Sequence, residues 1–483
     1  MTQHCPTTGC ALVSAKDYYS LHYGVSRLGT VACVRGSINF NQMQSERVCV
    51  IGAGAAGIAA AAALSEIDAP FNWFEAGSQF GGLWRYGNDA GCSVYASLAT
   101  NTSLRRMEWF GYKFPDRKND YLGHPEVLEY LSGFLNHAGL RDRITTSTRV
   151  TKVDILGPGR FRVHAEHRNG EQTTGEYRAV IVANGRNAVP KLPNIPGMQN
   201  VATMHASEYR TPDIFADKNV VVVGFGASGV DIASDAADVA KSVVLSSRGG
   251  GFLVPKYVGG RPRDENERAW LSLIPLWMRR QMWRAANLRR PSPPKVRMLE
   301  RGVRPFEKPA VLSDRIGALI EADKVVLKRG IQKVNPGAVT FDDASIVPCD
   351  VMVFATGYAT TFPFFSDEVT ARNGAFVDRY FRVIPPQEPG LYFVGQLSVA
   401  GPLFPLFERQ ARWVADVISG KCVLPRPERM RKLAAAQSRL GRKRFPDSTQ
   451  PHDFVEFYTY VRGLEKEHQA GRFRERAAVE MVA

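Results

Sequence analysis

The chain has 483 residues and a formal net charge of +15. Because a single hydrophobic core rarely grows beyond about 250 to 300 residues, this length predicts more than one domain. Seven thinly spread cysteines argue against a disulfide framework and for a reducing compartment, so we expect a cytoplasmic protein. The longest apolar stretch, residues 48–64, contains a glycine turn, and nothing resembles a secretory signal, so we expect no transmembrane span and no secretion.

Residues 1–46 form an N-terminal extension with little periodicity, and the extension ends just beyond Met43. We expect either a poorly ordered tail or a segment added by an upstream start codon.

An apolar run at residues 48–51 leads into Gly-Ala-Gly-Ala-Ala-Gly and then into an alanine-rich helical stretch. This order is typical of a dinucleotide-binding turn, where glycines let the backbone approach a pyrophosphate and the helix N-terminus offers N–H groups to the anion. The predicted binding residues are Gly52, Gly54, Ala55, Ala56 and Gly57.

A second apolar strand, residues 71–74, ends in Glu75, 18 residues past Gly57. A carboxylate at this place accepts hydrogen bonds from a ribose 2′-hydroxyl and repels a 2′-phosphate, so the first turn favours NAD or FAD. The alternative is that Glu75 is a solvated residue at a strand end.

The same device recurs at residues 220–229, so the chain should hold two dinucleotides. The next strand, residues 242–246, leads into Ser247 and Arg248, 19 residues past Gly229. A hydroxyl and a guanidinium suit the 2′-phosphate of NADPH, although Arg248 too could be merely solvated. The predicted binding residues of the second turn are Gly224, Gly226, Ala227, Ser228 and Gly229.

Cys5 and Cys10 have the C-x4-C spacing of disulfide reductases, which also carry two dinucleotide folds. In those enzymes the redox pair follows the first glycine turn, whereas here it precedes the first strand by more than 35 residues. We therefore expect two unpaired thiols.

Positive charge is concentrated in two segments. Residues 261–301 carry eleven Lys/Arg and four Asp/Glu, and residues 421–483 carry fourteen and eight. In the first segment, apolar residues at 270, 273, 274 and 277 fall on one face of a predicted helix, which could lie weakly on an anionic membrane surface. We favour the alternative that this stripe packs over the NADPH domain or lines a substrate entrance. Without a recognition motif, no nucleic-acid partner is expected.

Six further segments occur in one order along residues 47–420 and together resemble the flavin-containing monooxygenases, which are class B flavoprotein monooxygenases. They are Gly81–Arg85 (Gly-Gly-Leu-Trp-Arg), Tyr95–Met107 with its Thr100-Asn101 pair, Val182–Gly185, Phe354–Tyr358, Leu391–Gln396 and Glu408–Trp413.

Two places depart from the family pattern. The identifying motif keeps His205 and Tyr209 but has Gln199 and Val201 where Phe and Gly are usual. The first interdomain linker has Asn184 in place of Thr. We expect these changes to affect interdomain packing more than chemistry.

The resemblance implies an α/β fold with two dinucleotide-binding, Rossmann-like domains, the NADPH domain inserted into the FAD domain. The FAD-binding domain is expected at 47–188 and 353–483, the latter with C-terminal helices. The NADPH-binding domain is expected at 189–352, with the basic, Trp-rich insertion at 261–301.

The resemblance also implies cofactor contacts beyond the two turns. For FAD these are Gly82, Leu83, Trp84, Thr100, Gly395 and Gln396, and for NADPH they are Thr356 and Gly357. Asn101 is the catalytic candidate, because its amide can both donate and accept hydrogen bonds and so position the nicotinamide and the reactive flavin. The alternative is that Asn101 has a turn or helix-capping role. No metal site is expected.

In the implied reaction NADPH reduces FAD, O2 adds to give a 4a-hydroperoxyflavin, and this oxygenates an amine nitrogen or sulfide sulfur of a small organic substrate. Two alternatives stay open. One is a Baeyer–Villiger monooxygenase that converts a ketone to an ester, and the other is a non-oxygenating reductase or redox-responsive binding protein. Tyr209, where Baeyer–Villiger enzymes typically place Trp, favours oxygenation of an amine or a sulfide. A homodimer is left open.

Overall fold

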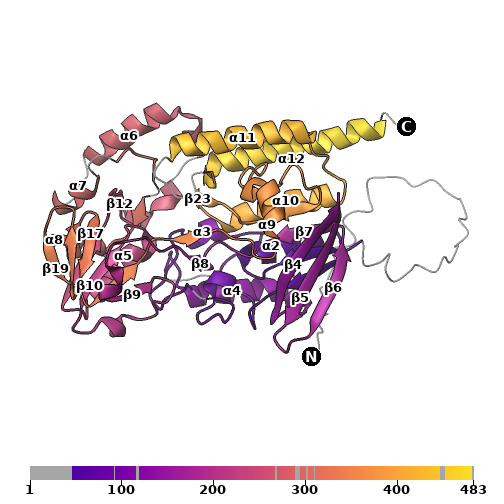
Figure 1. Cartoon of the computed structure of the whole chain (residues 1–483). Helices are drawn as coiled ribbons and strands as arrows, with labels where there is room; N and C mark the ends of the chain where they lie inside the picture. Colours follow the sequence, from indigo (N-terminus) through magenta and orange to yellow (C-terminus); the bar gives the residue numbers. More distant parts are fainter. Residues whose placement is uncertain are drawn as a thin grey trace, which may run out of the picture. The chain divides into compact units, whose positions relative to one another are not determined.

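The computed structural model describes residues 46–91, 93–115, 119–266, 269–288, 294–300, 303–308, 310–445 and 452–480. These residues lie in one compact unit, 41–483. The predictions for residues 1–45, including Cys5 and Cys10, fall outside the described residues. Two five-stranded parallel sheets organise the unit, and each has a glycine turn after its central strand (Figure 1). The predicted α/β fold with two dinucleotide-binding halves is confirmed.

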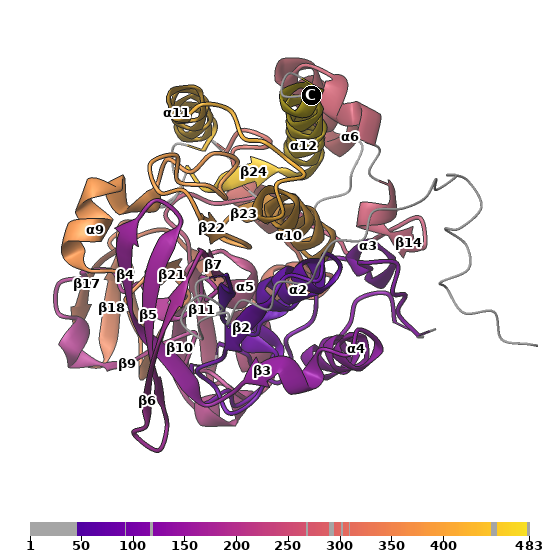
Figure 2. The ribbon, with the colours of Figure 1, turned by 90° about the vertical axis from the view of Figure 1, so that its right-hand side faces the viewer.

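The first sheet brings together strands from both ends of the described chain. In sheet order they are β22 (Leu391–Phe393), β7 (Ala179–Val182), β1 (Val48–Ile51), β2 (Phe71–Phe74) and β3 (Ile144–Thr145). Every side chain of β1 is buried, as expected for a parallel strand covered on both faces. The alanines of α2 (Ala55–Ser65) let this helix lie close to α10 (Phe404–Ile418). Figure 2 shows α2, α10 and α12 (Phe457–Glu480) one above the other.

The second sheet is formed between the two chain segments that build the first. Its strands in order are β16 (Val326–Lys328), β11 (Ser242–Ser246), β10 (Asn219–Val223), β20 (Val351–Phe354) and β9 (Ala202–His205). The helices α5 (Ala227–Ala236) and α8 (Ile316–Glu321) pack together beside it. β20 pairs with β10 over Val351–Phe354, so the second sheet extends past the boundary predicted at 352/353.

The chain crosses between the two sheets twice, and the two crossings are paired. β8 (Val189–Pro190) and β21 (Tyr358–Ala359) form a short antiparallel ribbon in which Tyr358 faces Pro190. The second-sheet segment therefore enters and leaves at one place.

Two antiparallel sheets and several short elements complete the unit. The sheets are β4 (Thr148–Gly157), β5 (Arg160–His167) with β6 (Gln172–Tyr177), and β17 (Ile331–Asn335), β18 (Ala338–Phe341) with β19 (Ile346–Pro348). The remaining strand pairs are β12 (Leu253–Val254) with β15 (Val311–Leu312), β13 (Tyr257–Val258) with β14 (Arg261–Pro262), and β23 (Ser398–Ala400) with β24 (Phe454–Glu456). The remaining helices are α3 (Leu104–Met107), α4 (His124–His137), α7 (Pro294–Glu300), α9 (Asp367–Arg372) and α11 (Pro427–Arg444). Among the described residues, the longer helices are too polar to cross a bilayer.

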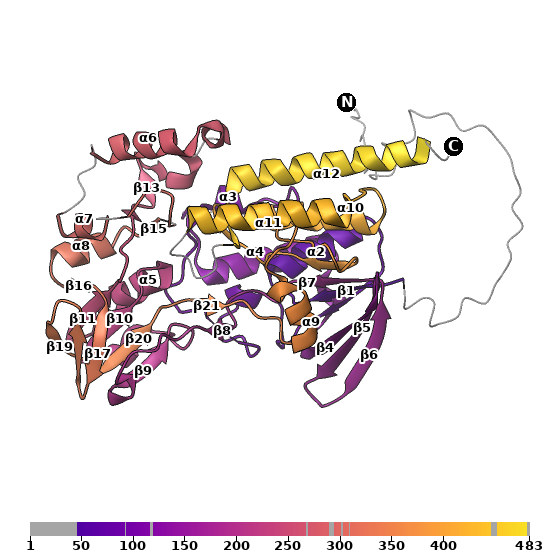
Figure 3. The same cartoon turned by 45° about the horizontal axis from the view of Figure 1, so that its top comes forward.

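The basic segment differs from its prediction. A 3-10 turn, η6 (Ala269–Leu273), precedes Pro275, and α6 (Leu276–Leu288) begins after it, so residues 270–277 do not share one helical face. Trp270, Leu273 and Trp277 are 56%, 68% and 65% exposed. The favoured expectation that this stripe is covered by the NADPH domain is therefore wrong for these three side chains. Trp283 packs edge-on against Phe252 with ring centroids 4.3 Å apart. Figure 3 shows α6 near the start of α12.

Candidate functional site

The first glycine turn is closed by backbone contacts that leave no room for side chains. Gly52 has a φ of +101°, and a Cβ there would lie 2.6 Å from the Ala183 carbonyl oxygen. A Cβ on Gly57 would lie 1.8 Å from the Gly52 oxygen. Gly54 is the N-cap of α2, so Ala55 and Ala56 begin the helix with N–H groups that have no intrahelical acceptor. The turn has the shape and polarity that a pyrophosphate needs.

Glu75 lies under this turn and is only 6% exposed. Its Oε2 accepts a 2.6 Å hydrogen bond from the Ala53 N–H, and its Oε1 accepts a 2.7 Å bond from the Gly77 N–H. Burial raises the pKa of the carboxyl, and the two N–H groups oppose this shift. Glu75 is thus a buried carboxylate bound to the turn, and the alternative of a merely solvated residue does not describe it.

Two more predicted FAD-binding segments converge on the same turn. A Cβ on Gly82 would lie 2.8 Å from the Gly54 Cα, and a Cβ on Gly395 would lie 2.7 Å from the Ala56 Cβ. Beside Gly82, Leu83 is 40% exposed, and Trp84 is half-buried with its ring edge-on to Phe404. Residues far apart in the sequence therefore build one cradle around the start of α2.

Gln396 is fully buried next to this cradle. Its Nε2 donates to the Asn184 Oδ1 at 2.9 Å and to the Gly185 carbonyl at 3.2 Å. Its Oε1 is buried and has no partner among the described residues. An unsatisfied buried acceptor is costly, and a flavin N–H is the kind of donor that would satisfy it. The glycine cradle and this orphaned oxygen both fit a bound FAD.

Thr100 and Asn101 differ in their surroundings. Thr100 is buried: its N–H donates to the Leu122 carbonyl at 2.8 Å, and its Oγ1 accepts from the Leu122 N–H at 3.0 Å. Asn101 is exposed, and its side chain makes no hydrogen bond to the described part of the chain. The N-cap of α3 is Ser103, so the helix-capping alternative for Asn101 is not what the structure shows. Its amide is free to meet a ligand.

The second glycine turn repeats the design of the first. Gly224 has a φ of +122°, and a Cβ there would lie 2.4 Å from the Ala355 oxygen. A Cβ on Gly229 would lie 2.0 Å from the Gly224 oxygen. Gly226 is the N-cap of α5, whose first residues are Ala227 and Ser228. Because its geometry matches that of the first turn, the second turn also suits a pyrophosphate.

Several basic residues lie at or near the carboxyl ends of β11 and β16. Ser247 is half-buried and donates its N–H to the Lys328 carbonyl at 2.9 Å. Arg248 is exposed, without an ion-pair partner among the described residues. The sequence pattern did not point to Lys308, whose Nζ donates to the Gly249 carbonyl at 3.1 Å, or to Arg329, whose carbonyl accepts from the Ser246 hydroxyl at 2.6 Å. The sequence does carry an unused signal for Arg329: the apolar run 325–327 is followed by Lys-Arg, as the strand 242–246 is followed by Ser-Arg.

The side chains of His205 and Tyr209 are held by hydrogen bonds within the protein. The His205 Nε2 lies 3.1 Å from the Gly357 carbonyl, and its Nδ1 accepts from the Ser207 N–H at 3.1 Å, which implies a neutral ring with the proton on Nε2. Burial lowers the pKa of His205 and favours the same state. Tyr209 is fully buried and donates to the Asp235 Oδ2 at 2.8 Å.

The two predicted NADPH contacts in the second crossing lie beside the first crossing. The Thr356 hydroxyl donates to the Lys191 carbonyl at 2.5 Å, and Gly357 has a φ of +80°. Thr356 and Gly357 thus bind the second crossing to Lys191 beside the first, and His205 holds Gly357. The contact of Thr356 and Gly357 with a dinucleotide stays a prediction.

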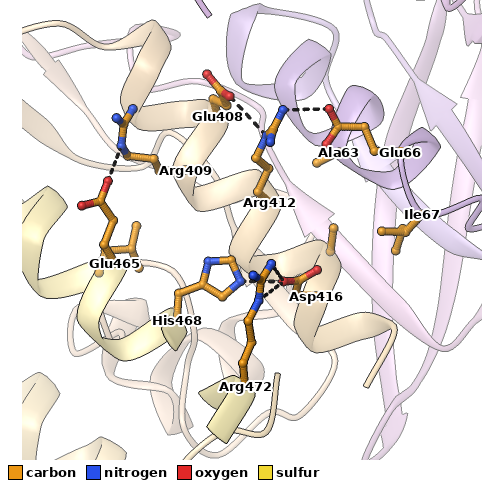
Figure 4. Close-up of a pocket in the computed structure, with 12 residues that line it drawn as sticks. Ala63, Glu66, Ile67, Glu408, Arg409, Arg412, Asp416, Glu465, His468 and Arg472 are labelled. Atoms are coloured by element: carbon orange, nitrogen blue, oxygen red, sulfur yellow. Dashed lines mark hydrogen bonds and ion pairs between the residues drawn. The ribbon is translucent and has the colours of Figure 1, made fainter. Parts of the chain in front are cut away.

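A charged groove of about 410 Å³ lies away from these residues, between α2, α10 and α12 (Figure 4). Arg412 pairs there with Glu66 at 2.8 Å and Glu408 at 3.2 Å, and Asp416 lies 2.7 Å from the His468 Nε2. Its acidic and basic side chains pair with one another, and no predicted cofactor residue lines it. In the described part of the chain, no three His, Cys, Asp or Glu side chains are grouped as metal ligands would be.

Residues 45–470 match a family model described as flavin-binding monooxygenase-like. Flavin-containing monooxygenase 1 of Homo sapiens is 30% identical over 416 residues, which cover 80% of this chain and 76% of the relative. Dimethylaniline monooxygenase [N-oxide-forming] 4 of Rattus norvegicus is 28% identical, covering 86% and 77%.

Solved structures give a consistent picture. S-allyl-L-cysteine S-oxygenase from Allium sativum is 26% identical with a TM-score of 0.65, covering 88% of this chain and 89% of that one. Cyclohexanone monooxygenase in the loose conformation has a TM-score of 0.67 at 19% identity, covering 88% and 98%, which is a likeness of fold.

Proposed function

This chain belongs to the flavin-binding monooxygenase-like family, whose members use FAD and NADPH, and we propose that it oxygenates an amine nitrogen or a sulfide sulfur of a small organic substrate. The observation that supports this substrate class is the similarity, at 26% identity over 88% of the chain, to an S-oxygenase. Tyr209 supports it too, since the resemblance places Trp there in Baeyer–Villiger enzymes. Membership in a monooxygenase family argues against the non-oxygenating reductase considered above.

The residues at the first turn are proposed to hold FAD. The cradle of Gly52, Gly54, Gly57, Gly82 and Gly395 would take the pyrophosphate and the adjoining chain, and the Ala55 and Ala56 N–H groups would donate to the phosphates. Glu75 would accept from the ribose. Gln396 would offer its unpartnered Oε1 to a flavin N–H. When bound, FAD supplies the redox chemistry: it takes hydride from NADPH and activates O2 for transfer to the substrate.

The residues at the second turn are proposed to hold NADPH. Gly224, Gly226 and Gly229 would admit the pyrophosphate, and Ser247 and Arg248 would bind the 2′-phosphate through charge-assisted bonds, with Lys308 and Arg329 close by. Asn101, exposed directly after the buried Thr100, would orient the nicotinamide and keep a proton near the flavin. Water has to be excluded there, because otherwise peroxide is released instead of product.

The overall reaction would consume NADPH, a proton, O2 and a sulfide and would give NADP⁺, water and the sulfoxide. To test it, the purified protein is supplied with NADPH and ¹⁸O2, together with an alkyl aryl sulfide, a tertiary amine or a cyclic ketone. We expect a sulfoxide or N-oxide that carries one ¹⁸O. A lactone from the ketone alone would favour the Baeyer–Villiger reaction, for which the fold of cyclohexanone monooxygenase is the supporting observation. Oxidation of NADPH with peroxide as the sole product would contradict both.

We also propose a weak association of the basic insertion with an anionic membrane surface. Trp270, Leu273 and Trp277 are exposed in a segment, 261–301, whose net charge is +7. Exposed aromatic and aliphatic side chains among arginines are typical of surfaces that lie against lipid headgroups.

A further inference from the structure

We propose that Tyr95 and Asp231 are positioning residues that hold the Asn101 segment at a fixed place relative to the second glycine turn. The inference rests on the proposed function, because it assumes that Asn101 acts on the nicotinamide and the flavin. Neither residue belongs to the predicted cofactor contacts, and neither is expected to touch substrate.

Tyr95 connects two parts of the molecule. It lies six residues before Asn101, in a segment whose end, Thr100, is bound to Leu122 beside the first sheet. Yet Tyr95 itself is only 1% exposed and lies in the hydrophobic core beside the second sheet, among apolar residues of α5 such as Val230 and Ala233. The segment 95–101 therefore runs from the core of the second sheet to the side of the first, and we call it the tether.

The contact at the start of the tether is polar and short. The Tyr95 hydroxyl donates to the Asp231 Oδ2 at 2.7 Å. Asp231 lies one turn inside α5, the helix that begins at the second glycine turn. One hydroxyl thus binds the helix that begins at the second glycine turn.

Neighbouring bonds fix the direction of the tether. The Ser97 hydroxyl donates to the Asp235 Oδ2 at 2.5 Å, one helical turn beyond Asp231. The Ala96 N–H donates to the Arg210 carbonyl at 2.9 Å. Further along, the Lys256 Nζ lies 3.4 Å from the Thr100 carbonyl, directly before Asn101.

Packing alone does not explain these groups. The half-buried Asp231 carboxylate loses part of its hydration, and apolar residues of similar size would fill the same space at less cost. The hydrogen bond between Tyr95 and Asp231 is directional, so it fixes one arrangement of the segment 95–101 against α5. A shift of about 1 Å in a reacting group can cost about 100-fold in rate, so such fixing matters where oxygen transfer competes with peroxide release.

The test uses Tyr95→Phe, which keeps the ring and removes only the hydroxyl, and Asp231→Asn. Tyr130→Phe is the matched control, because Tyr130 is also buried. Its hydroxyl bonds only to Tyr112 and Trp109 among the described residues, and these contacts lie beside the first sheet and not against α5. Three quantities are measured on the flavin-loaded full chain: the ratio of peroxide to oxygenated product, the affinity for NADP⁺ from the flavin spectrum, and hydrogen exchange of residues 96–104.

We expect both variants to retain FAD, to raise the peroxide-to-product ratio about tenfold, a usual size for coupling between two sites, and to speed exchange in 96–104. The control should change none of these. Wild-type ratios and wild-type exchange in both variants would overturn the proposal. If the wild type oxygenates none of the probes, the proposed function fails, and NADP⁺ affinity and exchange still decide the positioning role.

Discussion

The side-chain amide of Gln396 donates a 2.9 Å hydrogen bond to the Oδ1 of Asn184. Asn184 in turn donates its Nδ2 to the Thr361 carbonyl at 3.1 Å, so one side chain joins the first crossing, the chain beyond the second crossing and the flavin cradle. The resemblance had marked Asn184 as a departure from Thr, and its amide accepts from Gln396 and donates to the Thr361 carbonyl at the same time. The substitution is part of how this chain joins its halves.

Replacing Asn184 with Ala should weaken flavin retention. Gln396 would keep only the Gly185 carbonyl as a partner for its Nε2, and a lost buried bond costs about 1–3 kcal/mol. FAD remaining after gel filtration measures the effect. Asn200→Ala is the control, since Asn200 donates to the Val334 carbonyl at 3.1 Å and both residues lie between the two crossings, in the segment of the second sheet. Equal FAD loss in both variants would show that Asn184 has no special connecting role.

Replacing Arg248 with Ala should lower the affinity for NADPH roughly tenfold or more and leave that for NADH nearly unchanged, because bonds to charged groups are worth about 1.5–3 kcal/mol. Arg248 is exposed without an ion-pair partner in the described chain, so thermal stability should not fall. Stopped-flow reduction of the flavin at varied cofactor concentration measures both affinities. Lys324→Ala, another exposed cation, is the control. A parallel loss for NADPH and NADH would place the 2′-phosphate elsewhere.

Replacing Asn101 with Ala should preserve FAD binding, because the side chain is exposed and holds nothing in the described chain. Product per NADPH should fall, by up to about 100-fold for a lost positioned hydrogen-bond group, and peroxide should rise to match. Peroxide and product are quantified in the same reaction. An unchanged product yield would remove Asn101 from the reaction.

Changing Trp270, Leu273 and Trp277 to Ser should abolish binding to phosphatidylglycerol-containing vesicles, because these side chains are 56%, 68% and 65% exposed. Wild-type binding should weaken as salt is raised and be absent from neutral vesicles. Vesicle sedimentation measures it. Ile346→Ser is the control, with a side chain 65% exposed on β19. Wild-type binding by the triple variant would assign the patch to another role.

The stability difference between the wild type and Asp231→Asn should depend on pH. Burial raises the pKa of Asp231 to about 6, with Tyr95 and Lys256 opposing and Asp235 adding to the shift. At Asp231 the folded state then holds more protons than the unfolded state between pH values of about 4 and 6, so the contribution of Asp231 to stability falls as pH rises through this range. The change is ~3 kcal/mol and is absent in the Asn variant. Apparent melting temperatures of both proteins across this range test it, and a constant difference would contradict the raised pKa.

The sequence predicted the parts whose patterns are local. Both glycine turns and the strands before them follow from short motifs, because backbone geometry at Gly52 and Gly224 tolerates no other residue. The bond of Glu75 to the turn was not predicted, and its contact with a ribose stays a prediction. Contacts between distant segments were not predictable. Nothing near Tyr95 indicates that it enters the other core, and Lys308 reaches Gly249 only through the fold. The exposure of Trp277 was misjudged because Pro275 divides the segment into two elements. The domain boundaries, the roles of individual site residues, a cytoplasmic location and a homodimer stay predictions.

The pairing of β8 with β21 has a consequence for engineering. Residues 191–357 begin and end side by side, so they form a cassette that can be exchanged with only two neighbouring joints. With NADPH bound in this cassette, as proposed, a module transplanted from a relative would bring its own nicotinamide preference. The Thr356 hydroxyl and the Gly357 carbonyl, which bind Lys191 at the joint, lie inside the cassette, so a transplanted module must supply these contacts itself.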